Sequence, residues 1–517
     1  MSNIIGIDLG TTFSAIAKLD EYGQPAVIPV DGERIMASCV WVESSHKVTC
    51  GKEAYNELPT HANSVIRRFK REMGSDIVYR TPSGGEQTPS TASALILRKL
   101  VQEAENTEGS IRDVVITVPA NFAERQRKAT LAAGEQAGLN VLNIINEPTA
   151  AILSYATKQT VNGTVMVYDM GGGTFDVTIA RVKGTEIECL TSEGDSDLGG
   201  IDFDQKLAEI IDSKYKEEYG RSLKEALGLK NQEDELKSNE WQSLVVESEK
   251  IKCGLSKSET KQFRYNEGPD GGLRGEVTRK EFEQAISSLV ARAEMRVETA
   301  LDNVNMKPGD IDVVLLVGGS TRVPMVRESV KRIMGKEGSQ EVNPDEAVAL
   351  GAAIYAGLRS APEKLKPMQR EALKGVKVGD VANHFFGTIA LGIDEHRDTL
   401  EDSVTIILKK DAPIPCSNTV RLFTASEGQR FINFRLTQSP VEELDPEFVN
   451  IVFEDRLGPL PPNRPAQQPL DITYRYDVDQ VMWIEVSDVQ SGTLLKTTYR
   501  VNDTASASIS IPDFKID

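Results

Sequence analysis

The chain has 517 residues, of which 39% are hydrophobic and 26% charged, so it is long enough to form more than one folded domain. Its 78 acidic against 59 basic residues give a formal charge of −19, a balance that repels phosphate backbones and disfavours nucleic acid as a partner. No apolar stretch is long enough for a membrane span, and the first residues enter a β-type run directly, so we expect a cytoplasmic protein without membrane contact.

Two segments of the chain share one pattern: an apolar β-type run, an aspartate, a turn rich in Gly and Thr, and a second apolar run. The first covers 4–19 with Asp8 before its turn, and the second covers 165–182 with Asp169 in the same place. A single copy is typical of any β-hairpin. Two copies predict a duplicated domain with two facing lobes.

Helical and strand patterns alternate between and after these hairpins. The sequence predicts helices at 92–105, 279–304 and 347–358, and buried strands at 114–119 and 311–317. This alternation favours α/β layers with parallel strand pairing.

The character of the sequence changes near residue 361. Residues 362–377 are polar and rich in Lys, and the rest is dominated by short alternating runs, which predict an antiparallel β-sandwich. The expected strands are 403–408, 419–424, 431–436, 448–453, 470–476, 482–486 and 494–501, with a proline-rich loop at 457–469.

The two hairpin turns carry the pattern of a phosphate site. Glycine lets backbone N–H groups crowd against phosphate oxygens, and the two turns could clasp a polyphosphate from opposite sides. Asp8 and Asp169 open the turns where Mg²⁺ would be held, through water for the most part. Neither a Walker motif nor GxGxxG explains these turns, which disfavours P-loop and dinucleotide sites.

Seven motifs carry a family resemblance: IGIDLGTTFSAIA, VVITVPANFAERQRKAT, NIINEPTAAILSYA, YDMGGGTFDVTI, GDSDLGGIDFD, VVLLVGGSTRVPMV and NPDEAVALGAAIYA. In this order they closely resemble the seventy-kilodalton heat-shock chaperones (DnaK-like), over about the first 358 residues. The region after residue 380 resembles the family's β substrate-binding domain more weakly.

The resemblance implies an α/β fold: a duplicated two-lobe, actin-like ATPase followed by an all-β sandwich domain. The expected divisions are an ATPase domain at 1–360 (lobe I about 1–160, lobe II about 161–360), a linker region at 361–388, a sandwich at 389–503 and a tail at 504–517. It also implies ATP hydrolysis with Mg²⁺, K⁺ being a further candidate ion. Implied partners are unfolded or extended polypeptide, with a J-domain co-chaperone and a nucleotide exchange factor as candidates.

Site residues follow from the resemblance position by position. Lys70 would orient the attacking water and neutralise the γ-phosphate, which is the electrostatic work that phosphoryl transfer needs. The other catalytic candidates are Glu147, Asp195 and Thr174, and the metal candidates are Asp8 and Asp169. The nucleotide-binding candidates are Gly10, Thr11, Thr12, Gly171, Gly172, Gly173, Asp202, Glu249, Lys252, Ser256, Gly318, Gly319, Ser320, Arg322 and Asp345.

The β domain of the family binds extended apolar peptide in a groove. The matching positions here are Ile393, Phe423, Ile432 and Phe434. Alternating apolar residues of a sandwich are also its ordinary core, so both interpretations stay open. Lys70, in a basic run, could likewise be a solvated surface lysine, and Glu249 with Lys252 a surface pair.

Two features depart from the family. The leucine-rich interdomain linker is replaced by 380–387, DVANHFFG, so we expect weak linker docking held by Val381 and Phe385 alone. No long amphipathic helix follows Val501, so we expect no helical lid.

The favoured function is a chaperone that couples ATP binding and hydrolysis to binding and release of extended apolar peptides. One alternative is an ATP-regulated scaffold that binds one dedicated partner through the β domain. A sugar or acetate kinase on the same fold ranks last, because the motif set follows the chaperone pattern.

Overall fold

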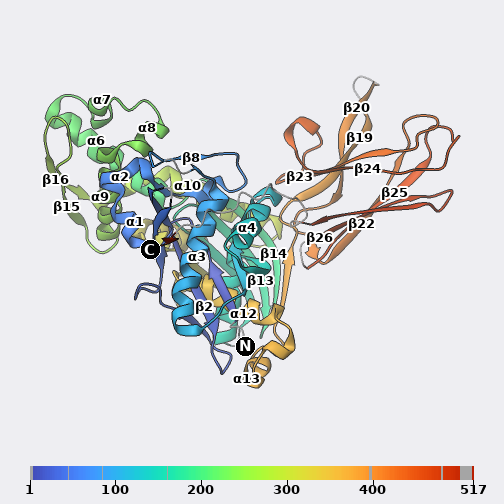
Figure 1. Cartoon of the computed structure of the whole chain (residues 1–517), viewed down its shortest axis with the longest axis horizontal. Coiled ribbons are helices and arrows are strands. Elements are labelled where there is room, and N and C mark those ends of the chain that lie inside the picture. Colours follow the sequence, from blue (N-terminus) through green and yellow to red (C-terminus); the bar gives the residue numbers. More distant parts are fainter. Residues whose placement is uncertain are drawn as a thin grey trace.

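The computed structural model describes residues 4–44, 46–83, 86–159, 161–339, 341–394, 399–478, 481–500 and 515–516. It shows two α/β lobes and, projecting to one side of them, an all-β domain (Figure 1). Most of the tail expected at 504–517 lies outside the described residues, as does the side chain of Ile393. No helix among the described residues is long and apolar enough to cross a membrane.

The main sheet of lobe I contains the first predicted hairpin. Its order is β11 (Asn140–Asn146), β10 (Asp113–Val118), β1 (Ile5–Asp8), β2 (Phe13–Leu19) and β3 (Pro25–Ile28), with β4 (Met36–Ala37) on β2. β1 and β2 pair antiparallel, whereas β1 and β10 are parallel. All six residues of β10 are buried, in agreement with the predicted buried strand, and the helices α3 (Pro89–Glu108) and α4 (Glu124–Gln136) belong to the same lobe.

A smaller sheet lies beside it in lobe I. It consists of β6 (Lys47–Cys50), β5 (Cys39–Ser44) and β7 (Val65–Arg67), and a short strand β28 (Lys515–Ile516) is added on the outer side of β6. The helices α1 (Lys52–Asn56) and α2 (Leu58–His61) follow β6 and lead toward lobe II, where α2 contacts α9 (Asn239–Leu255).

Lobe II repeats the arrangement around the second hairpin. Its sheet runs β17 (Val313–Val317), β12 (Asn162–Met170), β13 (Phe175–Lys183), β14 (Glu186–Asp195), β18 (Lys377–Val381) and β21 (Pro413–Ile414). β12 and β13 pair antiparallel and β12 and β17 parallel, the same relation as in lobe I, so the predicted duplication is confirmed. The helix α5 (Glu147–Lys158) follows β11 of lobe I and leads into β12. The other elements are α6 (Gly200–Tyr219), α7 (Leu223–Leu227), α8 (Gln232–Lys237), β15 (Thr260–Tyr265), β16 (Leu273–Thr278), α10 (Arg279–Asn303), α11 (Pro324–Met334), α12 (Ala347–Arg359) and α13 (Pro367–Ala372).

The small residues of α12 let the two lobes approach closely. An added Cβ at Gly351 would lie 1.8 Å from the carbonyl oxygen of Ala150 in α5, and one at Gly6 of β1 would lie 2.1 Å from the backbone of Ala353. Backbone atoms cannot yield to such overlaps as flexible side chains do. The close packing of β1, α5 and α12 therefore depends on glycine.

We predict that Gly351→Ala lowers the free energy of unfolding by about 1–3 kcal/mol or more, because overpacking a dense core is destabilising. Urea denaturation followed by circular dichroism measures this. The matched control is Gly309→Ala, where an added Cβ has no neighbour within 4 Å, and its unfolding midpoint should stay unchanged. Equal midpoints for the two variants would contradict the account of the lobe packing.

The β domain is a sandwich of two four-stranded sheets. One has the order β20 (Thr399–Leu408), β19 (Phe385–Asp394), β23 (Ile432–Ser439) and β24 (Asn450–Leu457). The other runs β22 (Cys416–Phe423), β25 (Pro469–Tyr476), β26 (Val481–Asp488) and β27 (Leu494–Arg500). Each predicted strand overlaps an observed one, and the sandwich begins at Phe385, earlier than the expected residue 389.

The linker region does not dock in the manner expected. β18 pairs parallel with β14, and Val381, Ala382, His384 and Phe386 are 2%, 0%, 7% and 2% exposed, whereas Phe385 is only partly buried. The expectation that Val381 and Phe385 alone hold the linker is therefore wrong. The reason is that residues 377–379, just before the linker, pair with β14, and such backbone hydrogen bonds need no leucine. Val381 packs in a core of the lobes, whereas Ala382 and Phe386 pack in the core of the β domain.

Candidate functional site

The two hairpin turns face each other across the lobes. An added Cβ at Gly172 would lie 2.3 Å from Thr12 Oγ1, and one at Gly173 would lie 2.5 Å from Thr11 Oγ1. Thr12 therefore approaches the backbone of the opposite turn, as the sequence predicted for a two-sided clasp. The first turn is held by Ser38, whose Oγ donates to Gly10 O at 2.7 Å.

Helix α6 and the loop after β17 complete the second turn. The N–H groups of Gly200 and Ile201 donate to Gly171 O and Gly172 O at 3.0 and 2.9 Å, and Ser320 Oγ donates to Gly171 O at 2.7 Å. Gly318 has a φ of 80°, and an added Cβ there would lie 2.4 Å from Met170 O, so this position needs glycine. These contacts bring Gly171, Gly172, Gly318 and Ser320 of the predicted set together.

Four buried or half-buried carboxylates lie around this clasp with one buried lysine. Lys70, in a 3₁₀ turn at Phe69–Glu72, is 3% exposed and forms an ion pair with Glu147 at the start of α5. Asp8 accepts a hydrogen bond from Thr117 Oγ1 at 3.0 Å, and Asp169 is 7% exposed. Asp176 of β13, at 1% exposed, is the fourth acid.

The electrostatics of this cluster favour a cation. Burial, together with the negative charge of Glu147, raises the pKa of Asp8 to about 7 and that of Asp176 to about 8, and shifts the pKa of Asp169 upward. The charge of Lys70 lowers all three pKa values. An uncompensated group of buried carboxylates is costly, and a metal ion is one means of neutralising it.

The arrangement of the carboxylates fits a hydrated metal ion better than an ion that is coordinated directly by protein side chains. Within the described residues, no three His, Cys, Asp or Glu side chains converge closely enough to hold a metal themselves. Mg²⁺ usually keeps several waters and takes one or two carboxylates together with phosphate oxygens. Asp8 and Asp169 would hold such an ion.

Lobe I also reaches across to lobe II through Arg71. Its Nε donates to Gly173 O at 2.8 Å, and its Nη2 forms an ion pair with Asp202 at 2.5 Å. Asp202 in turn accepts from Gly199 N at 2.7 Å. Asp202 therefore lies beside the second turn, and its predicted role in nucleotide binding stays a prediction. Arg71 was missed, although it directly follows Lys70 in the basic run.

Helix α9 carries the three residues predicted to form one face of the nucleoside pocket. Lys252 forms a 2.7 Å ion pair with Asp204 and donates to Gly200 O at 3.0 Å, and Glu249 accepts a hydrogen bond from Tyr55 of lobe I. Ser256 follows α9 and donates to Lys252 O at 3.0 Å. The interpretation of Lys252 and Glu249 as an isolated surface pair is wrong, because each has its own partner at the base of the cleft.

The remaining predicted positions differ in their partners and in their burial. Arg322 and Asp345 form a 2.5 Å ion pair, and Gly319 lies beside Asp345. Thr174 is 8% exposed at the end of the second turn. Asp195, at the end of β14, binds Arg292 of α10 at 2.7 Å, so its carboxylate already has a cationic partner outside the Lys70 cluster.

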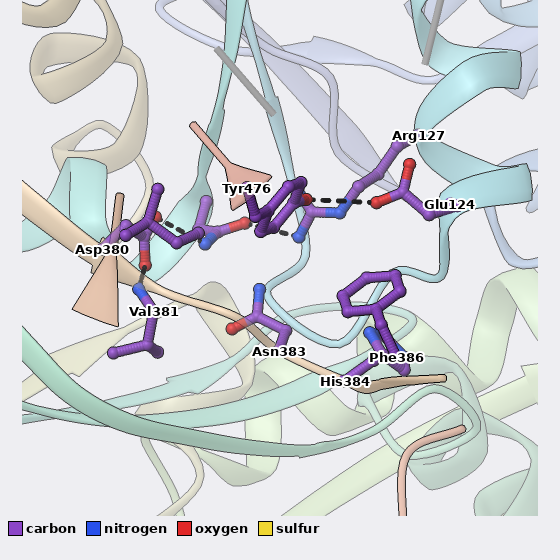
Figure 2. Close-up of a pocket in the computed structure, with 10 residues that line it drawn as sticks. Glu124, Arg127, Asp380, Val381, Asn383, His384, Phe386 and Tyr476 are labelled. Carbon is purple, nitrogen blue, oxygen red and sulfur yellow. Dashed lines mark hydrogen bonds between the residues drawn. The ribbon is translucent and has the colours of Figure 1, made fainter. Parts of the chain in front are cut away.

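A second polar site joins the ATPase to the β domain. It is a small cavity of about 10 Å³, and its lining includes Glu124, Arg127, Asp380, His384 and Tyr476 (Figure 2). Tyr476 Oη donates to Glu124 Oε1 at 3.2 Å, and Asn146 Nδ2 donates to Asp380 Oδ2 at 2.8 Å. Arg127 Nη2 donates to Asn146 Oδ1 at 2.8 Å.

This polar site is connected in sequence to the ion pair of Lys70 with Glu147. Asn146 directly precedes Glu147, so the linker carboxylate of Asp380 and the ion pair of Lys70 are connected through two adjacent backbone positions. Further contacts support the docked domain: Gln438 Oε1 accepts from Glu124 N at 3.2 Å, and Lys410 forms a buried ion pair with Glu193. The sequence alone did not predict these partners.

The four predicted peptide-groove positions are not equivalent. Phe423 is 59% exposed at the end of β22, and Ile432 is partly buried at the start of β23. Phe434 is 1% exposed and packs edge-on against Tyr474, with ring centroids 5.9 Å apart. The structure therefore places Phe434 in the sandwich core, because its side chain faces the other sheet.

Comparison with known proteins decides the family. The model of the family described as "Hsp70 protein" matches residues 4–82 and 76–509. The chain belongs to the Hsp70 family. It is 35% identical over 499 residues to "Chaperone protein DnaK" of Thermosipho melanesiensis, covering 95% of this chain and 78% of that relative. The protein of the same name from Thermotoga neapolitana is 36% identical over 501 residues, covering 95% and 79%.

Membership in the Hsp70 family agrees with the structure and with the predicted resemblance. The chain has the duplicated two-lobe ATPase fold with an appended β-sandwich. It is an ATP-binding ATPase and a molecular chaperone. The scaffold alternative is not favoured by these relatives.

We predict that Gly172→Ala weakens ATP binding at least about tenfold, roughly 1.4 kcal/mol, because the added methyl group would push the two turns apart. Rotation of Thr12 cannot relieve the contact, since the Cβ atoms of the two residues would be 2.9 Å apart. Isothermal titration with ATP measures the effect. The matched control is Gly171→Ala, whose Cβ would meet only Thr174 O at 3.7 Å, and equal affinities for the two variants would contradict the clasp.

Proposed function

We propose that this Hsp70 binds Mg²⁺-ATP between the two glycine turns and uses its hydrolysis to switch the β domain between states of different affinity for extended apolar peptide. The observation that carries the proposal is the docked linker. β18 is a strand of the lobe II sheet, and Asp380 within it accepts a hydrogen bond from Asn146, the neighbour of Glu147.

Each group in the clasp then has a defined task. Lys70 orients the attacking water and balances charge on the γ-phosphate, and Glu147 holds Lys70 in place. Mg²⁺, held by Asp8 and Asp169 mainly through water, would supply charge neutralisation of the phosphates. Thr11, Thr12 and Thr174 face the phosphates, and Asp202 fixes the second turn through Gly199. K⁺ remains a candidate second ion.

The peptide partner would bind at the exposed end of the sandwich near Phe423 and Ile432, as an extended chain with apolar side chains in pockets. A J-domain co-chaperone and a nucleotide exchange factor are further proposed partners, and this part of the proposal rests on family membership alone.

Steady-state ATPase turnover tests the proposal when measured with and without an array of extended apolar peptides. We expect peptide to stimulate turnover, because peptide binding shifts the equilibrium between the docked and the released β domain. Asp380 would transmit this shift through Asn146 to the ion pair of Lys70 with Glu147. Charged peptides of equal length are the control. Turnover that is equal with apolar, charged and no peptide would overturn the coupling.

A further inference from the structure

The smaller sheet of lobe I would end in an open edge without β28. β5 occupies one side of β6, and apart from β28 the backbone N–H and C=O groups on the other side of β6 have no strand partner among the described residues. An edge of this kind binds extended chains by strand addition. Val48 in β6 is 0% exposed and belongs to the core of lobe I, so the edge lies directly beside an apolar interior.

The chain itself supplies a strand to this edge. Lys515 and Ile516 pair parallel with Lys47 and Val48, and Ile516 packs as a partly buried side chain against the lobe I core. The end of the chain accordingly lies next to α1 in Figure 1, on the opposite side of the ATPase from the β domain. This segment is far in space from β27, the last strand of the sandwich, which ends at Arg500.

We propose that the open edge of β6 is a binding site for an extended peptide segment with one apolar anchor, and that residues 515–516 of this chain occupy it with Ile516 as the anchor. The site thereby makes a second connection between the β domain and lobe I, in addition to the linker. Backbone pairing provides the attachment, and the anchor provides the preference for an apolar side chain.

The position of β28 on β6 also affects the contact between the two lobes. β6 contacts α1, and Tyr55 of α1 donates a hydrogen bond to Glu249 of α9 across the cleft. A strand on the outer side of β6 therefore stabilises the part of lobe I that contacts α9 of lobe II.

A cysteine pair tests the register directly on the full chain. Lys47→Cys with Lys515→Cys places two thiols at positions that are partners in the β6–β28 ladder, and mild oxidation should join them, as mass spectrometry of the linked peptides shows. The matched control combines Lys47→Cys with Lys496→Cys, which lies in β27 of the sandwich. A missing cross-link at 47–515, or equal yields in the two variants, would overturn the proposal.

Hydrogen exchange tests the anchor. In Ile516→Asp the amides of β6 should exchange about tenfold faster than in the unmodified chain, because a charged side chain cannot enter the apolar interior. Val489→Asp adds the same charge at an exposed position of the β domain and should leave β6 unchanged. Equal exchange of β6 in all three proteins would show that Ile516 does not hold the strand.

Discussion

Single-turnover ATP hydrolysis should fall at least about tenfold in Lys70→Ala, which corresponds to 1.4 kcal/mol or more of barrier, while ATP affinity stays within a few-fold. Lys70 is the cation whose charge lowers the pKa values of Asp8, Asp169 and Asp176, and it is paired with Glu147. Without it, the buried carboxylates lose their compensating charge and, under the proposed function, the attacking water loses its donor. The glycine turns and α9, which we propose hold the nucleotide, stay intact.

The matched control for this variant is Lys52→Ala. Lys52 is another lobe I lysine with a carboxylate partner, Glu33 at 3.4 Å, but its side chain is 73% exposed. Its removal should leave hydrolysis unchanged, since exposed ion pairs contribute little. If Lys70→Ala hydrolyses ATP as fast as Lys52→Ala, Lys70 has no part in the reaction.

Acidification should release the β domain from the ATPase. His384 is 7% exposed in the docked linker, and burial, together with the charges of Arg127 and Lys410, lowers its pKa from 6.5 to about 3. The docked state therefore favours the neutral ring. Its contribution to docking is fully present above pH 6.5 and is lost progressively as the pH falls from 6.5 toward 3. Protonation of His384 by itself should weaken docking by about tenfold between pH 7.5 and 5.5.

The other titratable groups of this cavity act in the opposite sense. Burial raises the pKa values of Glu124 and Asp380, so docking takes up protons on these carboxylates and gains from acid. Comparison with His384→Leu separates the two effects, because the variant keeps both carboxylates and removes the ring. A fluorescence pair across the domains measures docking against pH. Identical pH profiles for the two proteins would show that His384 does not control docking.

The parts of the structure that the sequence predicted are those set by local pattern. The two hairpins with Asp8 and Asp169 were recognisable because the strand runs, the turn residues and the aspartate are contiguous. The strands of the sandwich followed from alternation. Alternation could not say which face is covered, so Phe434 in the core and Phe423 on the surface had the same signature.

Contacts between segments far apart in the chain could not be predicted. β18 pairs with β14 through residues 377–379, and β14 lies nearly two hundred positions earlier in the chain, so no local pattern indicates that partner. The ion pair of Asp195 with Arg292 and the addition of β28 to β6 are of the same kind. For the linker, the lost leucines suggested weak docking, but the strand pairing at 377–379 and the hydrogen bond from Asn146 to Asp380 hold this region instead.

The most direct test of coupling between the two sites is the affinity of the intact chain for a labelled apolar heptapeptide, measured by fluorescence anisotropy with ATP and with ADP. The contact from Asp380 through Asn146 to Glu147 predicts that ATP lowers peptide affinity at least about fivefold, roughly 1 kcal/mol of coupling. Equal affinities in the two nucleotides would contradict the account, because the docked linker would then carry no signal between the ATP site and the β domain.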